Sequence, residues 1–297
     1  MTTFVLLTIT GLGLGAMYFL IASGLSLIYG LMGVLNFAHG AFITVGSYAS
    51  WWMSVNVFDG VGSAWLRFLV SAICGLAAGA VFAALVELVL IRPLYLRHIE
   101  QVLVTVGLSI AFVALVQGIW GPDVHPYPSP GWLHETTTIL GAHIPNDRWV
   151  EIATAACVLA ALQLFLRRTR YGLIIRAGVE NRAMVTALGI DVRKAFTLVF
   201  AIGGAAAALA GALGGVYFGS VSPAQGGSLL IFAFIVVVIG GMGSVVGSAY
   251  AAVAVGLLQQ FVNYYGTAGL GDICVVALLA IVLLFRPQGI AGRAVTA

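Results

Sequence analysis

Charged side chains are scarce in this chain of 297 residues, in which Asp, Glu, Lys and Arg together make up 8%. A soluble domain carries about 25% of such residues. Hydrophobic residues make up 61% of the chain, and its mean hydropathy is +1.09. These values leave no room for a sizeable water-soluble domain. They exclude soluble enzymes, disordered regulators and proteins that bind nucleic acid, and they make the lipid bilayer the expected surroundings.

Two long stretches, residues 1–58 and 195–271, contain no charged side chain at all. Because one membrane-spanning helix needs about 20 apolar residues, the first stretch has room for two crossings and the second for three. The segment Phe232–Ile239 does not alternate between apolar and polar residues, as a membrane β-strand would. The sequence therefore predicts an all-α, polytopic transmembrane helical bundle that forms a single domain over residues 1–297.

Cysteine and lysine are also rare. Cys74, Cys157 and Cys274 lie far apart inside apolar segments and show no metal-ligand spacing, so we expect small buried residues with free thiols. The single lysine, Lys194, is followed by Ala195, whereas a phosphate-binding P-loop needs Lys followed by Ser or Thr. The chain therefore lacks that device for ATP hydrolysis, and neither a cofactor nor a metal is expected in it.

Two fragments resemble protease motifs but are incomplete. His134-Glu135-Thr136-Thr137-Thr138 begins like a zinc-protease helix and lacks its second histidine. Gly269-Leu270-Gly271-Asp272 is similar to a motif of intramembrane aspartyl proteases, whose chemistry needs two carboxylates that share one proton. The other carboxylate deep in a span is Glu87, so we expect no enzyme. Asp272 is expected to begin a helix.

The apolar segments predict eight or nine membrane crossings. The expected segments are Thr3–Ile28, Val34–Val57, Ala64–Ile91, Gln101–Trp120, Trp149–Leu166, Ala195–Tyr217, Ser228–Gly240, Val245–Tyr264 and Ile273–Phe285. Nine crossings would place the amino terminus outside, whereas eight would make one early segment re-entrant. Residues 121–148 hold five of the eight prolines and are too polar to cross, which predicts a periplasmic loop.

Residues 167–194 hold seven of the thirteen basic residues and are therefore expected in the cytoplasm, together with the carboxyl-terminal tail. Within this loop, Asn181 can cap a short amphipathic helix, and Gly189 can stop it. An apolar helix face needs a groove on a soluble partner or a seat on the protein itself, and we favour partner docking. The residues expected in this coupling loop are Arg176, Glu180, Asn181, Arg182, Ala187, Leu188 and Gly189.

Polar side chains inside the apolar segments are candidates for a substrate pathway. These are Asn36, His39, Thr44, Ser47, Thr105 and Ser109. Glycine pairs at Gly30–Gly33 and Gly240–Gly243 predict helix breaks, which often line substrate routes. The alternative is that these polar side chains bond neighbouring helices or carbonyls. Glu87, five residues before Arg92, is expected either to reach the surface or to pair with that arginine.

Glycine is abundant and spaced for close contact between helices. Small residues recur four apart at Gly11/Gly15, Gly75/Gly79 and Gly243/Gly247, and in the row Gly203, Ala207, Gly211, Gly215.

Four separate motifs resemble the permease subunits of bacterial ABC importers for branched-chain amino acids, the LivH type. The motifs are Gly24–Gly40; Thr169-Arg170-Tyr171-Gly172 with Arg176-Ala177 and Ala187–Ile190; Gly240–Ser244; and Phe285–Gly289. The resemblance covers nearly the whole chain and implies the ABC-importer permease fold in the bacterial inner membrane. It also implies two cytoplasmic ATPases that bind and hydrolyse ATP, a second permease that is a copy or a sister, and a periplasmic binding protein. The implied cargo is a branched-chain or other hydrophobic amino acid.

Three alternatives stay open at the level of the sequence, and one of them is a passive channel that needs neither ATP nor an ion gradient. Urea-import permeases have similar motifs, so a short amide is a second candidate cargo. An ion-coupled carrier would use Glu87 or His39 as a proton relay.

Overall fold

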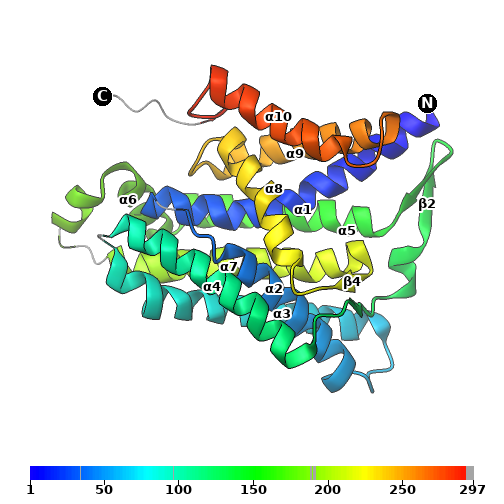
Figure 1. Ribbon diagram of the computed structural model, residues 1–297, viewed down its shortest axis with the longest axis horizontal. Helices are drawn as coiled ribbons and strands as arrows, with labels where there is room; N and C mark the ends of the chain where they lie inside the picture. Colours follow the sequence, from blue (N-terminus) through cyan, green and yellow to red (C-terminus); the bar gives the residue numbers. More distant parts are fainter. Residues whose placement is uncertain (34, 96, 188, 190–191, 292–297) are drawn as a thin grey trace.

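The computed structural model describes residues 1–33, 35–95, 97–187, 189 and 192–291, which form an almost entirely helical bundle (Figure 1). The α-helices are α1 (Thr2–Met32), α2 (His39–Trp52), α3 (Ala64–Val86), α4 (His98–Trp120), α5 (Asp147–Arg168), α6 (Arg170–Ala187), α7 (Val192–Phe218), α8 (Gln225–Gly240), α9 (Val245–Tyr265) and α10 (Leu270–Phe285). Short π or 3₁₀ turns are η1 (Met53–Val57), η2 (Glu87–Ile91), η3 (Arg92–Leu94) and η4 (Gly131–His134). The strands are β1 (His125–Pro126), β2 (Thr136–Ile139), β3 (Ala142–Pro145) and β4 (Ser220–Val221).

The all-α prediction is confirmed. Within the described residues, six helices are long and apolar enough to cross a membrane: α1, α3 with its η2–η3 extension, α4, α5, α7 and α9. Helices α8 and α10 are apolar but shorter. Each of the nine expected apolar segments overlaps one of the helices α1–α5 or α7–α10 over most of its length. The number of crossings, eight or nine, stays a prediction.

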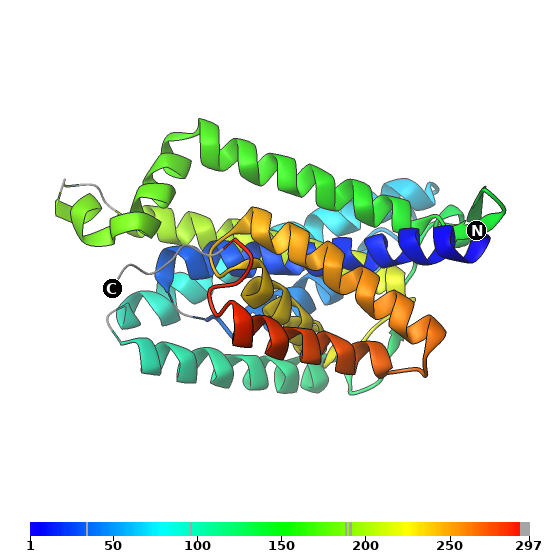
Figure 2. The same cartoon turned by 90° about the horizontal axis from the view of Figure 1, so that it is seen from above.

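Helices α1 and α7 form the centre of the bundle. Of the 18 residues in the most apolar window of each helix, 61% are buried in α1 and 67% in α7. The corresponding share is 11% in α4 and 17% in α5. Figure 2 shows α5 along one flank and α4 along the opposite flank. The flanking helices therefore present most of their apolar surface to lipid or to another subunit, as is usual for spans that do not lie in the core.

The glycine spacing has the expected role. A β-carbon on Gly15 would lie 2.7 Å from the carbonyl oxygen of Ala252 on α9, and one on Gly75 would lie 2.7 Å from that of Gly46 on α2. A β-carbon on Gly211 would overlap the backbone of Ile43. These helices approach so closely that only small residues fit between them.

The two ends of the bundle differ, and we call them the hairpin end and the α6 end (Figure 1). At the hairpin end, β2 and β3 pair in antiparallel register from Thr136 with Pro145 to Ile139 with Ala142. Strand β1 pairs with β4, and the nearby Tyr127 hydroxyl donates to Ser50 Oγ at 2.9 Å. Burial raises the pKa of the Tyr127 phenol to about 12, although the bond to Ser50 lowers it. Tyr127 therefore stays a donor that ties this end to α2.

The expectation of buried cysteines is wrong. All three thiols are free, but Cys157 is exposed and Cys74 and Cys274 are half-buried. Because lipid is as apolar as a protein core, a cysteine in a span need not face the inside of the bundle.

Candidate functional site

Two helix breaks meet at the α6 end of the bundle. Helix α1 ends at Gly33, which has a φ of 68°, and α8 ends just before Gly241, which has a φ of 97°. Both conformations favour glycine. A β-carbon on Gly30 would lie 3.0 Å from Cα of Gly243, which itself has a φ of 88°. The two expected breaks are therefore confirmed and lie against each other.

A narrow cavity lies beside the first break. Its walls come from α1 and the segment that follows it, from η2, from α4 and from α7. The residues that line it are Ile28, Met32, Leu35, Asn36, Ile91, Gln101, Thr105 and Phe200. Five of them are apolar and three are polar, so the cavity combines apolar walls with a few polar groups.

The polar groups of this cavity come from two elements. Asn36 is 4% exposed, and its Oδ1 accepts a bond from the backbone N–H of Ala38 at 3.1 Å, which forms the turn before α2. Its Nδ2 has no hydrogen-bond partner among the described residues. On α4, Gln101 Nε2 donates to the carbonyl of Leu94 at 2.7 Å. Thr105 donates to the carbonyl of Val102 at 3.0 Å.

The six pathway candidates separate into two groups. Asn36 and Thr105 line the cavity, and His39, Thr44, Ser47 and Ser109 do not. His39 is fully buried, and its Nε2 lies 3.0 Å from the carbonyl oxygen of Ile21, an arrangement that matches a structural histidine. Thr44 and Ser47 donate to carbonyls of their own helix at 3.2 and 3.0 Å. Ser109 is half-buried on α4.

Glu87 belongs to a hydrogen-bonded cluster that the sequence indicated only in part. It is fully buried and pairs with Arg92, whose Nε lies 3.3 Å from Glu87 Oε1. Thr197 on α7 donates to Glu87 Oε2 at 2.7 Å, and the Tyr95 hydroxyl donates to Oε1. Burial raises the pKa of the Tyr95 phenol, which therefore remains a donor. The pairing of Glu87 with Arg92 is as expected, whereas Tyr95 and Thr197 are additions.

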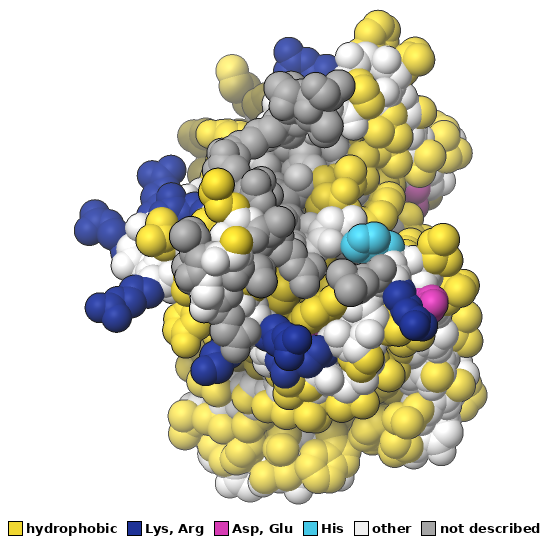
Figure 3. Space-filling model, turned by 90° about the vertical axis from the view of Figure 1, so that its left-hand side faces the viewer, with side chains coloured by type: hydrophobic (Ala, Val, Ile, Leu, Met, Phe, Trp, Pro, Cys, Tyr) yellow, Lys and Arg dark blue, Asp and Glu magenta, His cyan; other side chains and the backbone are white. Residues whose placement is uncertain are grey.

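Helix α6 occupies the expected coupling loop. Arg176 and Ala187 are exposed on it, and Gly189 follows it with a φ of 75°. The backbone of Glu180, Asn181 and Arg182 is helical, but their side chains and residue Leu188 lie outside what the structure describes. Figure 3 looks onto this end and shows Lys and Arg side chains gathered there. The seven coupling residues stay a prediction.

The predicted start of this helix at Asn181 is wrong. Helix α6 begins at Arg170, and Asn181 lies inside it. The N-terminal cap is Thr169, whose Oγ1 accepts a bond from the backbone N–H of Gly172 at 3.0 Å. A threonine caps a helix as an asparagine does, and the earlier cap adds three turns to the helix. Gly189 is placed to end it, as expected.

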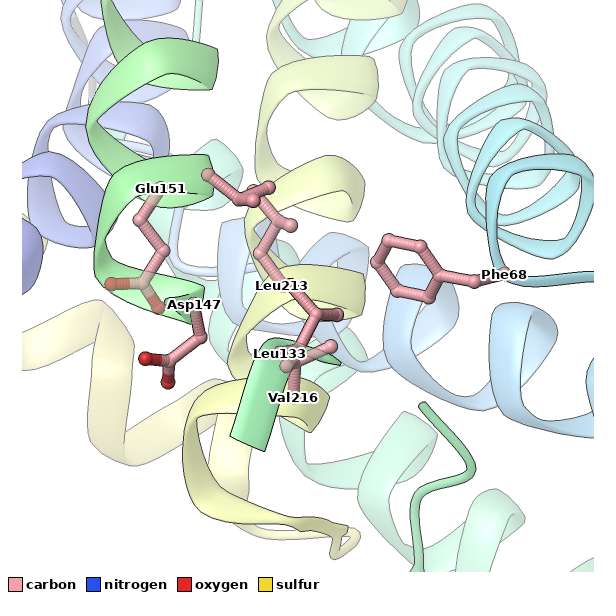
Figure 4. A pocket seen from close by; sticks show the side chains of 7 residues that line it. Phe68, Leu133, Asp147, Glu151, Leu213 and Val216 are labelled. Carbon is pink, nitrogen blue, oxygen red and sulfur yellow. The ribbon is translucent and has the colours of Figure 1, made fainter. Parts of the chain in front are cut away.

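A second pocket lies at the hairpin end and is shown in Figure 4. Asp147 and Glu151 at the start of α5 line it, together with Phe68, Leu133 and Val216. Arg148 lies between the two carboxylates, 3.6 Å from Asp147 and 3.3 Å from Glu151. Its guanidinium carbon is also 3.6 Å from the centre of the Tyr217 ring. Because the arginine binds both acids and an aromatic ring, we interpret this cluster as an anchor between α5 and α7.

Gln101, Tyr95 and Thr197 are candidate site residues that the sequence patterns did not indicate. Each lies in a segment where apolar or basic neighbours determine the local hydropathy and charge, so a single polar side chain gives no separate signal. Gln101 could have been predicted from its position one helical turn before Thr105. Residues four apart lie on the same helix face, so the two polar side chains would be expected to lie together.

Comparison with known proteins covers nearly the whole chain. The family described as "Branched-chain amino acid transport system / permease component" matches residues 7–285. The permease protein LivH of the Escherichia coli high-affinity branched-chain amino acid transport system is 30% identical over 95% of this chain and 94% of its own length. BraD of Pseudomonas aeruginosa is 31% identical over 96% and 94%. LivM of Escherichia coli is 27% identical over 92% of this chain and 67% of LivM. No solved structure matches the chain.

Proposed function

Because the chain belongs to the family of permease components of branched-chain amino acid transport systems, we propose that it is the non-catalytic membrane subunit of an ATP-driven ABC importer. Its cargo is a branched-chain or other hydrophobic amino acid that a periplasmic binding protein delivers. The observation that carries the proposal is the match to the family over residues 7–285, together with the helical bundle. The chain lacks a P-loop, so partner subunits bind and hydrolyse ATP.

We propose two kinds of partner in the membrane complex besides the binding protein. Two cytoplasmic ATPases bind the α6 end, and a second permease completes the pathway. Escherichia coli has two proteins similar to this chain, LivH and LivM, which are both named as permease proteins of a high-affinity branched-chain amino acid transport system. This pair favours a sister permease over a second copy of the same chain.

The orientation follows from the position of the basic residues. The α6 end carries Arg167, Arg168, Arg170 and most other cations, and the positive-inside rule assigns such an end to the cytoplasm. The carboxyl-terminal tail then lies in the cytoplasm, and the hairpin end with residues 121–148 lies in the periplasm. The chain is thus a multi-pass protein of the bacterial inner membrane.

The coupling surface is helix α6 with Gly189. A β-carbon on Gly178 of α6 would lie 3.1 Å from the side chain of Leu31, near the end of α1. Helix α6 therefore rests against the helix that leads into the cavity. When ATP binding closes the ATPases, movement of α6 would reach this wall.

The pathway passes the cavity at Asn36, Gln101 and Thr105. Its apolar walls suit an aliphatic side chain, and the unpartnered Nδ2 of Asn36 suits a carboxylate oxygen. His39, Thr44 and Ser47 support the helix crossings beside this route, and Ser109 lies one turn beyond Thr105.

Reconstitution in liposomes tests the proposed function. Uptake of leucine, isoleucine or valine is expected only when the chain is combined with its ATPases, its sister permease and the binding protein, and only with ATP present. Radiolabelled uptake and ATP hydrolysis are measured together. ATP-independent uptake by the chain alone would contradict the importer assignment, and selective uptake of urea would replace the proposed cargo.

The pathway assignment predicts a loss of transport in Asn36→Leu and Gln101→Leu. A hydrogen bond to a charged group contributes about 1.5–3 kcal/mol, so uptake is expected to fall roughly tenfold or more. Assembly with the ATPases should persist, because neither residue lies on α6. Asn56→Leu is the matched control, since Asn56 is exposed on η1 and donates to the carbonyl of Trp52. If Asn56→Leu lowers uptake by the same factor, the assignment of the cavity to the pathway is wrong.

A further inference from the structure

Glu87 lies on a π-helical turn rather than on regular α-helix. Helix α3 continues into η2, which spans Glu87–Ile91, and Arg92 is its C-terminal cap. A π turn aligns residues five apart, so it places Arg92 directly over Glu87. Such turns are frequent at functional sites. Here the turn directs a buried carboxylate towards α7 at the α6 end of a membrane span.

The cluster around Glu87 joins three separate segments. Arg92 donates through its guanidinium to Glu87 Oε2 at 3.4 Å and to Thr197 Oγ1 at 2.8 Å. Tyr95, in the turn before α4, donates to the same carboxylate, and its ring lies 4.7 Å from that of Phe196 on α7. One carboxylate therefore ties the end of α3, the α3–α4 turn and the start of α7 together.

This cluster borders the cavity and includes the start of α7. Thr197 and Phe196 belong to the second turn of α7, the helix that follows α6 along the chain. On the other side, Gln101 donates to the carbonyl of Leu94, in the turn between Arg92 and Tyr95. Ile91 of η2 and Phe200 of α7 are themselves cavity walls. A displacement of α7 is therefore passed to two walls of the cavity.

We propose that Glu87 is the positioning residue that transmits movement of α6 to the cytoplasmic cavity. Leaving a buried charge without its partner is strongly unfavourable, so α7 and the α3–α4 turn are expected to move as one body. The walls at Ile91, Gln101 and Phe200 then open or close when the ATPases move α6. This inference rests on the proposed function and adds to it the link between ATP hydrolysis and the gate.

The test uses the complete reconstituted importer and measures uptake and ATP hydrolysis in the same vesicles. In Glu87→Gln the carboxylate charge is lost, and in Thr197→Val the hydroxyl bridge is lost. We expect both variants to assemble with the ATPases and to hydrolyse ATP. The number of amino acids imported per ATP should fall at least fivefold. Thr197→Ser keeps the hydroxyl and should restore the wild-type ratio.

Glu151→Gln is the matched control for the replacement of a buried acidic side chain by its amide. The Glu151 side chain is 2% exposed and lies 3.3 Å from Arg148, whereas that of Glu87 is fully buried and lies 3.3 Å from Arg92. Glu151 lies at the hairpin end, far from α6 (Figure 1). Its replacement is expected to lower stability and to leave the ratio of import to hydrolysis unchanged.

An unchanged ratio in Glu87→Gln and Thr197→Val, or an equal fall in Glu151→Gln, would overturn the inference. If Glu87→Gln does not fold, Thr197→Val compared with Thr197→Ser decides the question. The proposed function fails separately, because it requires ATP-dependent uptake by the wild-type complex.

Discussion

Gly46→Leu is expected to leave almost no folded protein, because the new side chain has no space. Gly46 is buried on α2, and even a β-carbon there would overlap the backbone of Ala208 on α7. Helix α3 is also close, because a β-carbon on Gly75 would lie 2.7 Å from the Gly46 carbonyl oxygen. Overpacking usually costs about 1–3 kcal/mol, and the backbones of two neighbouring helices prevent relief, so a larger loss is expected.

The measurement is the fraction of monodisperse protein after extraction in mild detergent, together with its thermal unfolding temperature. Gly107→Leu is the matched control. Gly107 lies inside α4, where an added β-carbon meets no atom of the described part of the chain within 4 Å. Leucine is about 1 kcal/mol better than glycine as a helix former, so the control should be as stable as the wild type or more so. If both variants collapse alike, close helix packing at Gly46 is not the cause.

Gly189→Trp is expected to abolish assembly with the ATPases while the permease itself stays folded. Gly189 is exposed and has a φ of 75°, and an added β-carbon there would meet no atom of the described residues within 4 Å. Its left-handed conformation costs a non-glycine residue roughly 1–2 kcal/mol, and the indole adds bulk where the partner would bind. Co-purification of the ATPases with the tagged permease is expected to fall more than tenfold. Glu180→Arg, which reverses a charge on α6, should weaken it in the same direction.

Gly121→Trp controls for backbone strain without touching the coupling surface. Gly121 has a φ of 89° and follows α4 at the opposite end of the bundle, and an added β-carbon there also meets no described atom within 4 Å. The tryptophan imposes at least the same backbone strain at Gly121. ATPase assembly should nevertheless be unaffected, because Gly121 lies far from the coupling surface. If assembly survives Gly189→Trp and Glu180→Arg, or is lost equally in Gly121→Trp, the coupling role of α6 is wrong.

The start of α2 shows where sequence patterns fail. Val34 to Val57 is a continuous apolar run, and the sequence predicted a span beginning at Val34. The structure begins α2 at His39, because the Asn36 side chain accepts a bond from the N–H of Ala38 and turns the chain. This arrangement is an Asx turn, in which an Asn or Asp side chain bonds the nearby backbone in place of the helical hydrogen bonds. Hydropathy alone does not reveal it.

Helix α6 was misplaced for a related reason. Thr169 and Asn181 are both acceptable caps, and the basic residues between them weaken any apolar periodicity. Only the backbone of the folded chain distinguishes the two starts. The cap that formed is the one next to α5, where Thr169 Oγ1 also donates to the carbonyl of Phe165 at 2.7 Å.

The sequence by itself determined that this protein lives in a membrane, that its helices pack through glycine, and that its charges gather at one end. These properties can be read from local sequence, because a helix is stable in lipid only if its own residues are predominantly apolar. The tertiary structure alone decided which polar groups meet. Glu87 and Thr197 are 110 positions apart and bond only because α3 and α7 pack together. Asn36 and Gln101 share a cavity for the same reason, since side chains on different helices become neighbours only through packing.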